Sequence, residues 1–566
     1  MPSAVSRYRL IVFVLLVAAV VPYFIDLNGS SIWDANEAYY VETPREMMQR
    51  GDYISPTFNH EPRFNKPVLS YWVVAAFYKV FGVSVGVQRL PIAIGAVVLI
   101  LTAFFLARAA QPPHARGAAT WAALGLAVAP RLLMFSRRIF IDISISMFMG
   151  LTLLFFALAE RYPERRRLYL PLMYGAAGLG VLTKGPVALA LPGLVFGAYL
   201  LLHGELKRVR GMLLPAGIVI VLAIVVPWYA ALYHQYGWMY IRSFLLDENV
   251  ARYAAGVGVQ VSRPPWYYLP VLLSDPFPWS LCLFGGAAAW FADRRQARLA
   301  PRDAPAEERS TEHRAFRVRT LLWLWVGVIV VFFSLSAAKQ DLYVFPVVPA
   351  VAALGGLFIA GAGGPAPARA LGWTTLAMGL VLAIAGAGVL YVFETAGKIY
   401  ALDGAAFVGM VGAAGGLSTL ILVLLRKPRA ALVAVVLSLV VVNWTFVLSV
   451  LPSFERYKPV PALSEVIRQR VAPDDVVAHY RVALPSMVFY LGRHIEVMLD
   501  RDEFLRTIEG SRTVYAVLSA ADYADLGAAA AGTCVLARRP TVNVKLNAVL
   551  ARKPLPEVLL ITNRCQ

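Results

Sequence analysis

The sequence has few charged residues and very few cysteines. Of its 566 residues 15% are charged and 59% are hydrophobic, and the mean hydropathy is +0.63. Three cysteines in so long a chain exclude a disulfide scaffold. Apolar runs of about 20 residues recur along the sequence, and this is the length that a helix needs to cross a bilayer. The composition therefore excludes an ordinary soluble protein and predicts a polytopic α-helical membrane protein.

Acidic residues are also scarce, because 34 of them face 53 lysines and arginines and leave a net charge of +19. Such a surplus can indicate nucleic-acid binding. The arginines, however, cluster in short loops between apolar runs, as they do in the cytoplasmic loops of membrane proteins. We therefore expect membrane lipids as partners and no nucleic acid. The first apolar run, Leu10 to Phe24, lacks a convincing cleavage site and is expected to remain as the first span.

The apolar runs predict about thirteen spans. They are 8–26, 89–110, 117–135, 140–160, 168–183, 186–203, 212–231, 268–291, 319–336, 342–363, 370–392, 404–425 and 430–451. A further piece, 68–82, is too short to cross comfortably, and we expect an interfacial or re-entrant helix there.

Basic residues recur in alternate loops, from Arg7 and Arg9 to the arginine-rich loop 292–318 and the turn at 426–429. This pattern predicts a cytoplasmic N-terminus, and an odd number of spans then places the tail outside the cytoplasm. We expect a transmembrane domain over residues 1–453, with a site formed by the outer loops 27–88 and 232–267, and a second domain over residues 454–566.

The tail differs in kind from the rest of the chain. Short β-rich runs at 476–480, 495–499, 513–518 and 558–562 alternate with helix-like pieces at 485–491 and 502–509. This pattern predicts a small α/β domain. Cys534 and Cys565 lie in it, and the sequence leaves open whether they form a disulfide or stay as two thiols.

Cations on the predicted outer side break the positive-inside pattern. Any one of them is more often an interface residue whose charge reaches into water. As a set they predict a site for an anionic group, and a phosphate is the natural candidate. The strongest candidates are Lys66, Lys184, Arg137 and Arg138, and the same loops also carry Arg63, Arg242, Arg252, Arg263 and Lys339.

Carboxylates occur in the same outer loops. Asp34, Glu37 and Asp142 are predicted to be functional, because an ionisable group at a membrane boundary is costly to place. They would orient or deprotonate an acceptor. Glu42 and Glu46 are instead expected on a solvated helix face with Arg45 and Arg50. Asp247 and Glu248 follow in the long loop.

A metal site is not expected. His60 with Glu61, or His234 with Asp247, can be assembled into a site on paper, but no zinc-like ligand spacing is present. No cofactor is predicted either, since the sequence has no Rossmann fingerprint.

Several motifs together resemble a known family. They are Asp34-Ala-Asn-Glu37-Ala-Tyr-Tyr, Pro44-Arg45-Glu46-Met47, Gly51-Asp52-Tyr53, Phe64-Asn65-Lys66-Pro67, Tyr71-Trp72, Lys184-Gly185-Pro186, Trp266-Tyr267-Tyr268-Leu269-Pro270 and Lys339-Gln-Asp-Leu-Tyr343. Over about residues 8–350 their order is similar to that of the bacterial membrane GT-C glycosyltransferases. That branch includes protein mannosyltransferase-like enzymes and the aminoarabinose transferase of lipid A, which also ends in a small periplasmic domain.

The resemblance implies a GT-C fold and the transfer of a sugar from a polyprenyl-phosphate carrier to an extracytoplasmic acceptor such as lipid A. The sugar implied is 4-amino-4-deoxy-L-arabinose or a related one. Lys66 would hold the carrier phosphate, with Lys184 close to the first-loop acids, and Asp142 would be the second acid. Residues expected to line the cavity are Tyr39, Tyr343, Trp266 and Tyr267.

Some positions depart from the family pattern. Asn36 stands where an aspartate is usual and Tyr39 where arginine is common, so Asp34 or Glu37 would carry the acidic role. Asn65 and Asn249 stand where the aminoarabinose transferase has residues that bear on a metal. Amides are poor zinc ligands, so an inherited metal is not expected and aminoarabinose as the sugar is in doubt.

The expected mechanism is direct displacement at the anomeric carbon. Lys66, Lys184 and either Arg137 or Arg138 would stabilise the leaving phosphate. Two other functions stay open: a polysaccharide polymerase or ligase with a lipid-linked donor, and a lipid or solute transporter. A transporter would place ionisable residues near the middle of its spans, where this sequence has almost none.

Overall fold

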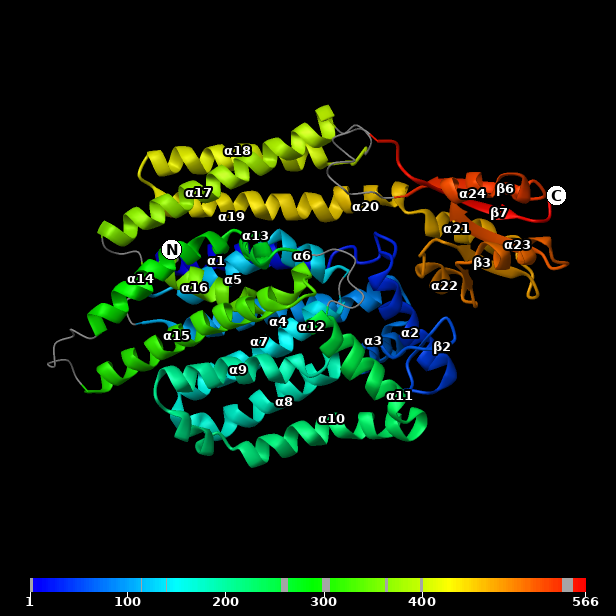
Figure 1. Cartoon of the computed structure of the whole chain (residues 1–566). Coiled ribbons are helices and arrows are strands. Elements are labelled where there is room, and N and C mark those ends of the chain that lie inside the picture. Colours follow the sequence, from blue (N-terminus) through cyan, green and yellow to red (C-terminus); the bar gives the residue numbers. More distant parts are fainter. Residues whose placement is uncertain are drawn as a thin grey trace.

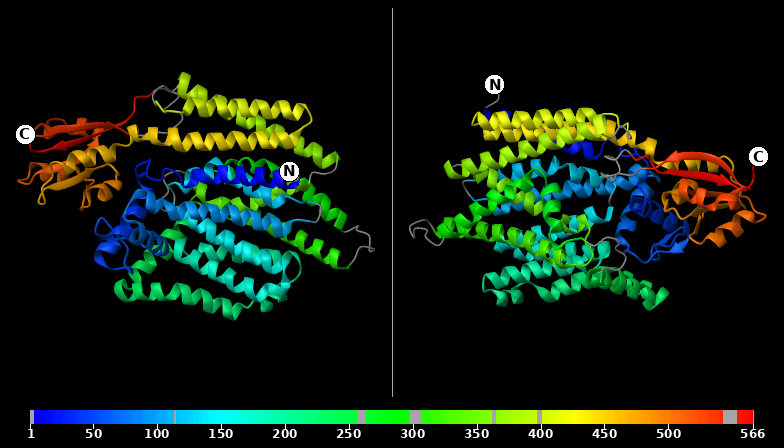
Figure 2. Two further views of the ribbon diagram at one scale, coloured as in Figure 1. Left: turned by 180° about the vertical axis from the view of Figure 1, so that it is seen from behind. Right: turned by 45° about the horizontal axis from the view of Figure 1, so that its top comes forward.

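The computed structural model describes residues 4–112, 115–138, 140–255, 263–297, 306–361, 365–396, 401–541 and 553–565. Long helices lie side by side with their axes roughly aligned, and a smaller mixed α/β unit lies at one end of them (Figures 1 and 2). The same end holds the first loop with α2 (Asn36–Arg50) and α3 (Leu69–Phe81). Parts of the predicted loops 232–267 and 292–318, namely 256–262 and 298–305, lie outside the described residues.

The helical part consists mainly of apolar helices. They are α1 (Ala4–Val20), α4 (Val85–Ala110), α5 (Ala118–Ala127), α6 (Pro130–Ser136), α7 (Phe140–Arg161), α8 (Arg166–Lys184), α9 (Val187–Leu202), α10 (Leu214–Tyr236), α14 (Cys282–Ala297), α15 (Ala306–Leu335), α16 (Val348–Gly361), α17 (Pro365–Leu390), α18 (Ala405–Leu424) and α19 (Pro428–Thr445).

Fewer of the described helices are long and apolar enough to cross a membrane than the thirteen spans predicted from the sequence. Among the described residues, eight helices are long and apolar enough to cross a bilayer, or nine if α5 and α6 form one bent span. Many apolar side chains on these helices are exposed; on α10, for example, Ile218 and Val219 are more than half exposed. Such a surface suits contact with lipid, and the chain is a polytopic helical membrane protein. The count of thirteen stays a prediction.

Two predicted spans are not straight helices. The span predicted at 117–135 bends by 57° between α5 and α6, where Pro130 starts the second helix. The span predicted at 268–291 is broken into α13 (Tyr268–Ser274), a short 3-10 turn (Trp279–Leu281) and α14. The break coincides with Pro276 and Pro278, because proline lacks the amide hydrogen that a continuous helix needs.

Helices in the core pack closely around two buried tryptophans, Trp279 and Trp325. Trp279 lies against Gly125 of α5, where an added Cβ would come within 2.0 Å of the indole nitrogen. It also donates a hydrogen bond of 2.5 Å to the carbonyl of Trp121. Glycine is required at position 125 because no side chain fits beside the ring.

The tail contains a five-stranded mixed sheet in the order β4-β3-β5-β7-β6. β3 pairs in parallel with β4 and β5, whereas β7 pairs antiparallel with β5 and β6. The four predicted strands are present, and β6 was not predicted. The strands are β3 (Val476–Tyr480), β4 (Glu496–Met498), β5 (Val514–Ser519), β6 (Cys534–Pro540) and β7 (Glu557–Thr562).

Both faces of this sheet are covered by helices. The alternation of side chains along β3 sends Val476, Ala478 and Tyr480 to one apolar cluster and Val477 to another. Cys534 and Cys565 form a disulfide, which answers the question that the sequence left open. The domain boundary at 453/454 stays a prediction. The helices are α21 (Pro459–Arg468), α22 (Ser486–Leu491), α23 (Arg501–Glu509) and α24 (Ala520–Leu526).

Candidate functional site

A cavity of about 620 Å³ opens where the helical part meets the first loop. Its walls come from α2, α7, α8, α9, α15, the loop before α3 and the segment around Tyr343. The predicted site residues that line it are Tyr39, Lys66, Arg138, Asp142, Lys184 and Tyr343. These residues are far apart in the sequence, so the fold brings together one coherent part of the predicted set.

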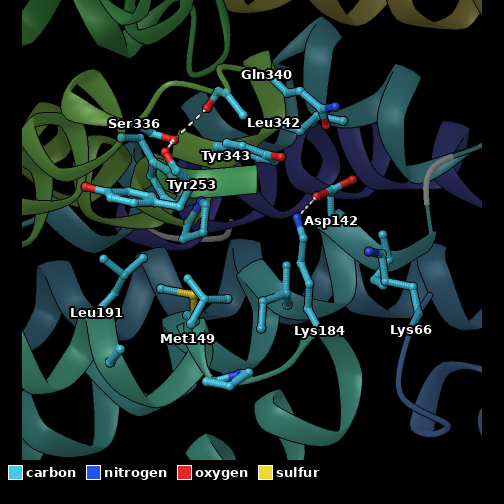
Figure 3. A pocket seen from close by; sticks show the side chains of 18 of the residues that line it. Lys66, Asp142, Met149, Lys184, Leu191, Tyr253, Ser336, Gln340, Leu342 and Tyr343 are labelled. Carbon is cyan, nitrogen blue, oxygen red and sulfur yellow. Dashed lines mark hydrogen bonds and ion pairs between the residues drawn. The ribbon is translucent and has the colours of Figure 1, made fainter. Parts of the chain in front are cut away.

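Asp142 and Lys184 form an ion pair in the wall of this cavity (Figure 3). Asp142 lies in the first turn of α7 and Lys184 in the last turn of α8, which ends at Gly185 with a φ of 103°. Both side chains keep some exposure, 14% for Asp142 and 19% for Lys184. The ammonium of Lys184 also lies 5.3 Å from the centre of the Tyr343 ring. The pair is therefore anchored on two helix ends yet accessible to a ligand.

Lys66 enters the same cavity from the loop before α3, on the side of the Asp142–Lys184 pair away from Met149 and Leu191 (Figure 3). Its backbone carbonyl accepts a hydrogen bond from the hydroxyl of Tyr240, 3.3 Å away. The sequence predicted Lys184 near the first-loop acids. The structure pairs it with Asp142 instead, so Lys66 and Lys184 share the cavity without Asp34 or Glu37.

Arg63 also lines the cavity, although no individual role is predicted for it from the sequence. Its guanidinium lies 3.7 Å from the ring centre of Tyr39, and its Nε donates to the Tyr71 hydroxyl at 3.2 Å. The stacking fixes both Arg63 and Tyr39 in the wall. Its only signal in the sequence was its place among the outer-side cations, three residues before Lys66. Tyr253 and Gln340 likewise line the cavity without an individual prediction, and so does Asn36, which stands where the family usually has an aspartate.

The other half of the cavity is apolar. Ile145 and Met149 come from α7, Leu191 from α9, and Phe332 and Phe333 from α15. In Figure 3 Met149 and Leu191 lie on the opposite side of the Asp142–Lys184 pair from Lys66. The cavity therefore presents cations at one end and hydrocarbon at the other, which suits a ligand with a charged head and an apolar chain.

Arg137 and Arg138 are neighbours with different surroundings. Arg137 is buried, and its guanidinium donates to the carbonyls of Pro22, Ile25 and Asp26 at 2.9, 2.8 and 2.6 Å. It holds the end of the first helix and does not line the cavity, so the structure does not support Arg137 as a ligand of the donor phosphate. Arg138 does line the cavity.

Glu37 does not reach the cavity. It forms an ion pair with Arg89 of α4 in which neither side chain is exposed, with Nε to Oε1 at 2.7 Å and Nη2 to Oε2 at 2.9 Å. Arg89 also donates to the carbonyls of Leu27, Ser30 and Ser31. All this places Glu37 in the framework of the loop. A catalytic role for Glu37 is not supported, because substrate has no access to it.

Asp34 also lies away from this cavity. Its carboxylate accepts hydrogen bonds from the backbone nitrogen and the hydroxyl of Ser486, at 2.7 and 2.6 Å. Burial raises the pKa of Asp34 to about 6, against the lowering effect of these hydrogen bonds. Asp34 thus connects the first loop to the tail, and within the described part of the chain the acid that lines the cavity is Asp142.

The expectation for Glu42 and Glu46 is wrong. Both are buried, with about 1% exposure, rather than on a solvated face. Glu42 pairs with Arg45, and Glu46 accepts a hydrogen bond from the Thr57 hydroxyl at 2.6 Å. The tail and the β1–β2 hairpin (Thr57–Phe58 and Glu61–Pro62) cover this face of α2, which a helical pattern could not reveal.

Trp266 and Tyr267 do not line the cavity either. Trp266 is 64% exposed, and the hydroxyl of Tyr267 accepts a hydrogen bond from Arg263 at 2.6 Å. The long loop contributes Val250, Tyr253 and Ala254 to the wall instead. The side chains of residues 247–249 and 252 lie outside the described part of the chain.

No metal centre can be assigned. Within the described residues, no group of three or more histidine, cysteine, aspartate or glutamate side chains could hold an ion. Asn65 offers an amide oxygen, which zinc binds poorly.

With this geometry described, comparisons identify similar proteins. Residues 65–230 match the family model described as dolichyl-phosphate-mannose-protein mannosyltransferase. The chain has the fold of ArnT from Cupriavidus metallidurans in the apo state, with a TM-score of 0.76 over 99% of both chains at 22% identity. The structure of the same protein bound to undecaprenyl phosphate matches with a TM-score of 0.73 over 98% of both chains, also at 22% identity.

The chain is also similar in sequence to bacterial sugar transferases. It is 30% identical over 381 residues to the undecaprenyl phosphate-α-4-amino-4-deoxy-L-arabinose arabinosyl transferase of Pectobacterium carotovorum, covering 66% of this chain and 64% of that protein. It is 27% identical to arabinosyl transferase 1 of Pseudomonas fluorescens, covering 63% and 58%. The chain thus spans less than two thirds of the length of these relatives. The resemblance noted from the sequence motifs is confirmed.

Proposed function

We propose that this protein is an integral-membrane glycosyltransferase of the bacterial inner membrane. It would move 4-amino-4-deoxy-L-arabinose, or a related sugar, from a polyprenyl-phosphate donor to lipid A at the periplasmic face. The observation that carries the proposal is the two-ended cavity, in which Lys66, Lys184 and Arg138 gather at one end and apolar side chains at the other. The names of the relatives support the donor and the sugar.

The cations would bind the phosphate that leaves. As the bond between the anomeric carbon and the phosphate oxygen breaks, negative charge develops on the polyprenyl phosphate. Fixed positive groups in a water-poor cavity stabilise that charge. Asp142 holds the ammonium of Lys184 in place. Ile145 and Met149 on α7 and Leu191 on α9 would contact the first isoprene units.

Little base is needed if the acceptor is a phosphate of lipid A, because its oxygen is already anionic. The acceptor oxygen forms the new bond to the anomeric carbon, and the bonding electron pair leaves with the polyprenyl phosphate. The acid in the cavity then positions cations rather than removing a proton. An acceptor hydroxyl would instead need a base, and among the described side chains Asp142 is the carboxylate that lines the cavity.

The thirteen predicted spans, the cytoplasmic N-terminus and the periplasmic tail belong to this proposal. They are supported by the basic loops and by the place of the tail beside the first loop, at the cavity end of the helices (Figure 1).

The test is transfer by the purified chain in liposomes that contain polyprenyl-phosphate-linked aminoarabinose and lipid A. Mass spectrometry of lipid A should show one added pentosamine. Lys66→Ala should lower transfer about a hundredfold, because one fixed charge at the leaving group is lost. Lys79→Ala is the matched control: Lys79 lies on the adjacent helix with its ammonium 4.4 Å from the Tyr53 ring and does not line the cavity.

Three results would contradict the proposal. Equal transfer by the Lys66→Ala and wild-type proteins would remove the donor-site assignment. Longer glycans in place of a single added sugar would favour a polymerase or ligase, and movement of the lipid without a new bond would favour a transporter.

A further inference from the structure

A second cavity, of about 570 Å³, adjoins the first. It lies between the helical part and the tail, and its wall includes Trp33, Asp34, Met134 and Lys458. Arg138 lines both cavities, so the two share a wall at this residue. A transferase that joins two lipids needs two sites that meet at the reacting atoms, and the proposed donor occupies only the first cavity.

The polar end of the second cavity carries three cations, Arg137, Arg138 and Lys458, and the carboxylate of Asp34. The ammonium of Lys458 lies 3.9 Å from the ring centre of Trp33, and the guanidinium of Arg138 lies 5.5 Å from it. Lys458 pairs with Glu455 at 3.0 Å and donates to the Ser31 carbonyl at 2.7 Å. Burial lowers the pKa of Lys458 to about 8, although Glu455 opposes the shift. An anion bound here would offset part of the free-energy cost of burying these charges.

Arg138 has donor capacity that the described residues do not use. Its Nε is buried without a hydrogen-bond partner among them, and its Nη2 contacts only the weak acceptor Sδ of Met134, at 3.8 Å. A buried guanidinium nitrogen without an acceptor is costly. A phosphate oxygen bound at the shared wall would supply the missing acceptor.

The rest of the second cavity is apolar. Met134 comes from α6, Phe446 and Leu451 from the end of the last membrane helix, and Phe454 and Val460 from the segment that leads into the tail. Hydrocarbon walls at the end of a membrane helix suit acyl chains, which could enter from the bilayer. This segment and the tail lie at the same end of the molecule as the first loop (Figures 1 and 2).

We infer that the second cavity binds the acceptor lipid, with the phosphate of its headgroup at Arg138 and Lys458 and its acyl chains along Phe446 and Leu451. The inference rests on the transferase function proposed above. A lipid phosphate is the chemistry common to donor and acceptor; the second cavity is assigned to the acceptor because the Asp142–Lys184 pair and Lys66 line only the first. Arg138 then stands where the two phosphates approach each other and offsets their repulsion.

The test places a negative charge at the lip of the second cavity. Pro461 lines it and lies in the first turn of α21, where an acidic residue suits the helix N-terminus. Pro461→Glu should raise the KM for lipid A about tenfold by repelling its phosphate, with the KM for the polyprenyl-phosphate sugar unchanged. Ala462→Glu is the matched control, because Ala462 is the next residue of the same turn and lines neither cavity.

A second measurement separates this inference from the proposed function. Radiolabelled lipid A is bound to the purified protein without any donor, and Pro461→Glu should weaken binding by a similar factor. Site-dependent binding without transfer in the wild-type protein would leave the acceptor site standing and overturn the transferase. Transfer by the wild-type protein with equal KM for lipid A in both glutamate variants would overturn the acceptor site. A raised KM for the donor alone would assign the second cavity to the donor chain.

Discussion

Two regions at the cavity end of the molecule each contain a carboxylate paired with a cation, and the two pairs do different work. The Glu37–Arg89 pair lies inside the first loop with no exposure on either partner, and Arg89 is surrounded by backbone carbonyls. The Asp142–Lys184 pair lies in a cavity wall, and both partners remain partly exposed. The first pair holds a loop on α4, whereas the second can meet a ligand.

The difference shows that an ionisable residue at a membrane boundary is not functional for that reason alone. Burying a charge is costly in both regions. In the loop the cost is offset by a complete set of hydrogen bonds within the protein. In the cavity the cost of burying the charges is offset only in part, so these charges can still attract a substrate. Access for the substrate therefore separates a structural pair from a candidate catalytic one.

The largest expected effect comes from breaking the structural pair. Arg89→Met leaves the Glu37 carboxylate buried without its partner and should lower the free energy of unfolding by about 3–5 kcal/mol. The measurement is the thermal unfolding midpoint of the detergent-purified protein. The double variant Arg89→Met with Glu37→Leu removes both charges and should recover much of the loss. An unchanged midpoint for Arg89→Met would mean that the pair does not support the loop.

Breaking the second pair should affect activity rather than stability. Asp142→Asn frees the Lys184 ammonium from its fixed position, and transfer should fall about a hundredfold. The unfolding midpoint should stay close to that of the wild type, since both side chains can reach water. Transfer and unfolding are measured on the same preparation, with Asp52→Asn as the control at an ion pair outside the cavity. If Asp142→Asn lowered stability as much as Arg89→Met does, the Asp142–Lys184 pair would also be structural, and the proposed difference between the two pairs would be wrong.

The neighbours Arg137 and Arg138 repeat the contrast one residue apart. Arg137→Met removes hydrogen bonds to three carbonyls and should destabilise the protein by about 2–3 kcal/mol. Arg138→Met should leave stability nearly unchanged and lower transfer about tenfold. Paired unfolding curves and initial rates check this, and the opposite assignment of the two effects would contradict the description of the cavity.

The smallest expected effect is on pH dependence within the first loop. Burial raises the pKa of Glu42 to about 7, although Arg45 opposes the shift. The folded state then binds the proton more tightly than the unfolded state between about pH 4.5 and 7, so the stability due to protonation falls as pH rises through that window. Glu42→Gln should flatten this part of the stability profile by a few degrees in the unfolding midpoint. A wild-type slope retained in Glu42→Gln would assign the effect to another carboxyl, such as that of Asp34, whose pKa is about 6.

Much of the architecture could be predicted from the sequence, because hydrophobic length and periodicity are local properties. The long apolar runs are helices, and four strands of the tail appear where β-rich runs were read. The errors occur where local pattern is not enough. The span at 268–291 was drawn through Pro276 and Pro278, and β6 was missed. The face of α2 with Glu42 and Glu46 was taken as solvated because the tail that covers it comes more than 400 residues later.

The candidate site divides in the same way. Lys66, Lys184, Asp142 and Tyr343 were found from charges on the wrong side of the membrane and from motifs similar to those of the GT-C family. Asp34, Glu37 and Arg137 carry the same signals and do not line the first cavity, although Asp34 and Arg137 line the second. No property of a single position distinguishes them, since each is a charged residue near the end of an apolar run.

The sequence by itself determined that this chain is a polytopic membrane protein with cations gathered on one side, because composition and the spacing of apolar runs are independent of how the helices pack. Only the tertiary structure decided which charges serve the framework and which face a cavity. The role of each charge depends on residues distant in the sequence. Arg89 pairs with Glu37 and buries it, and the carbonyls of Pro22 and Asp26 accept hydrogen bonds from Arg137. The Asp142–Lys184 pair between α7 and α8 remains partly exposed to a ligand.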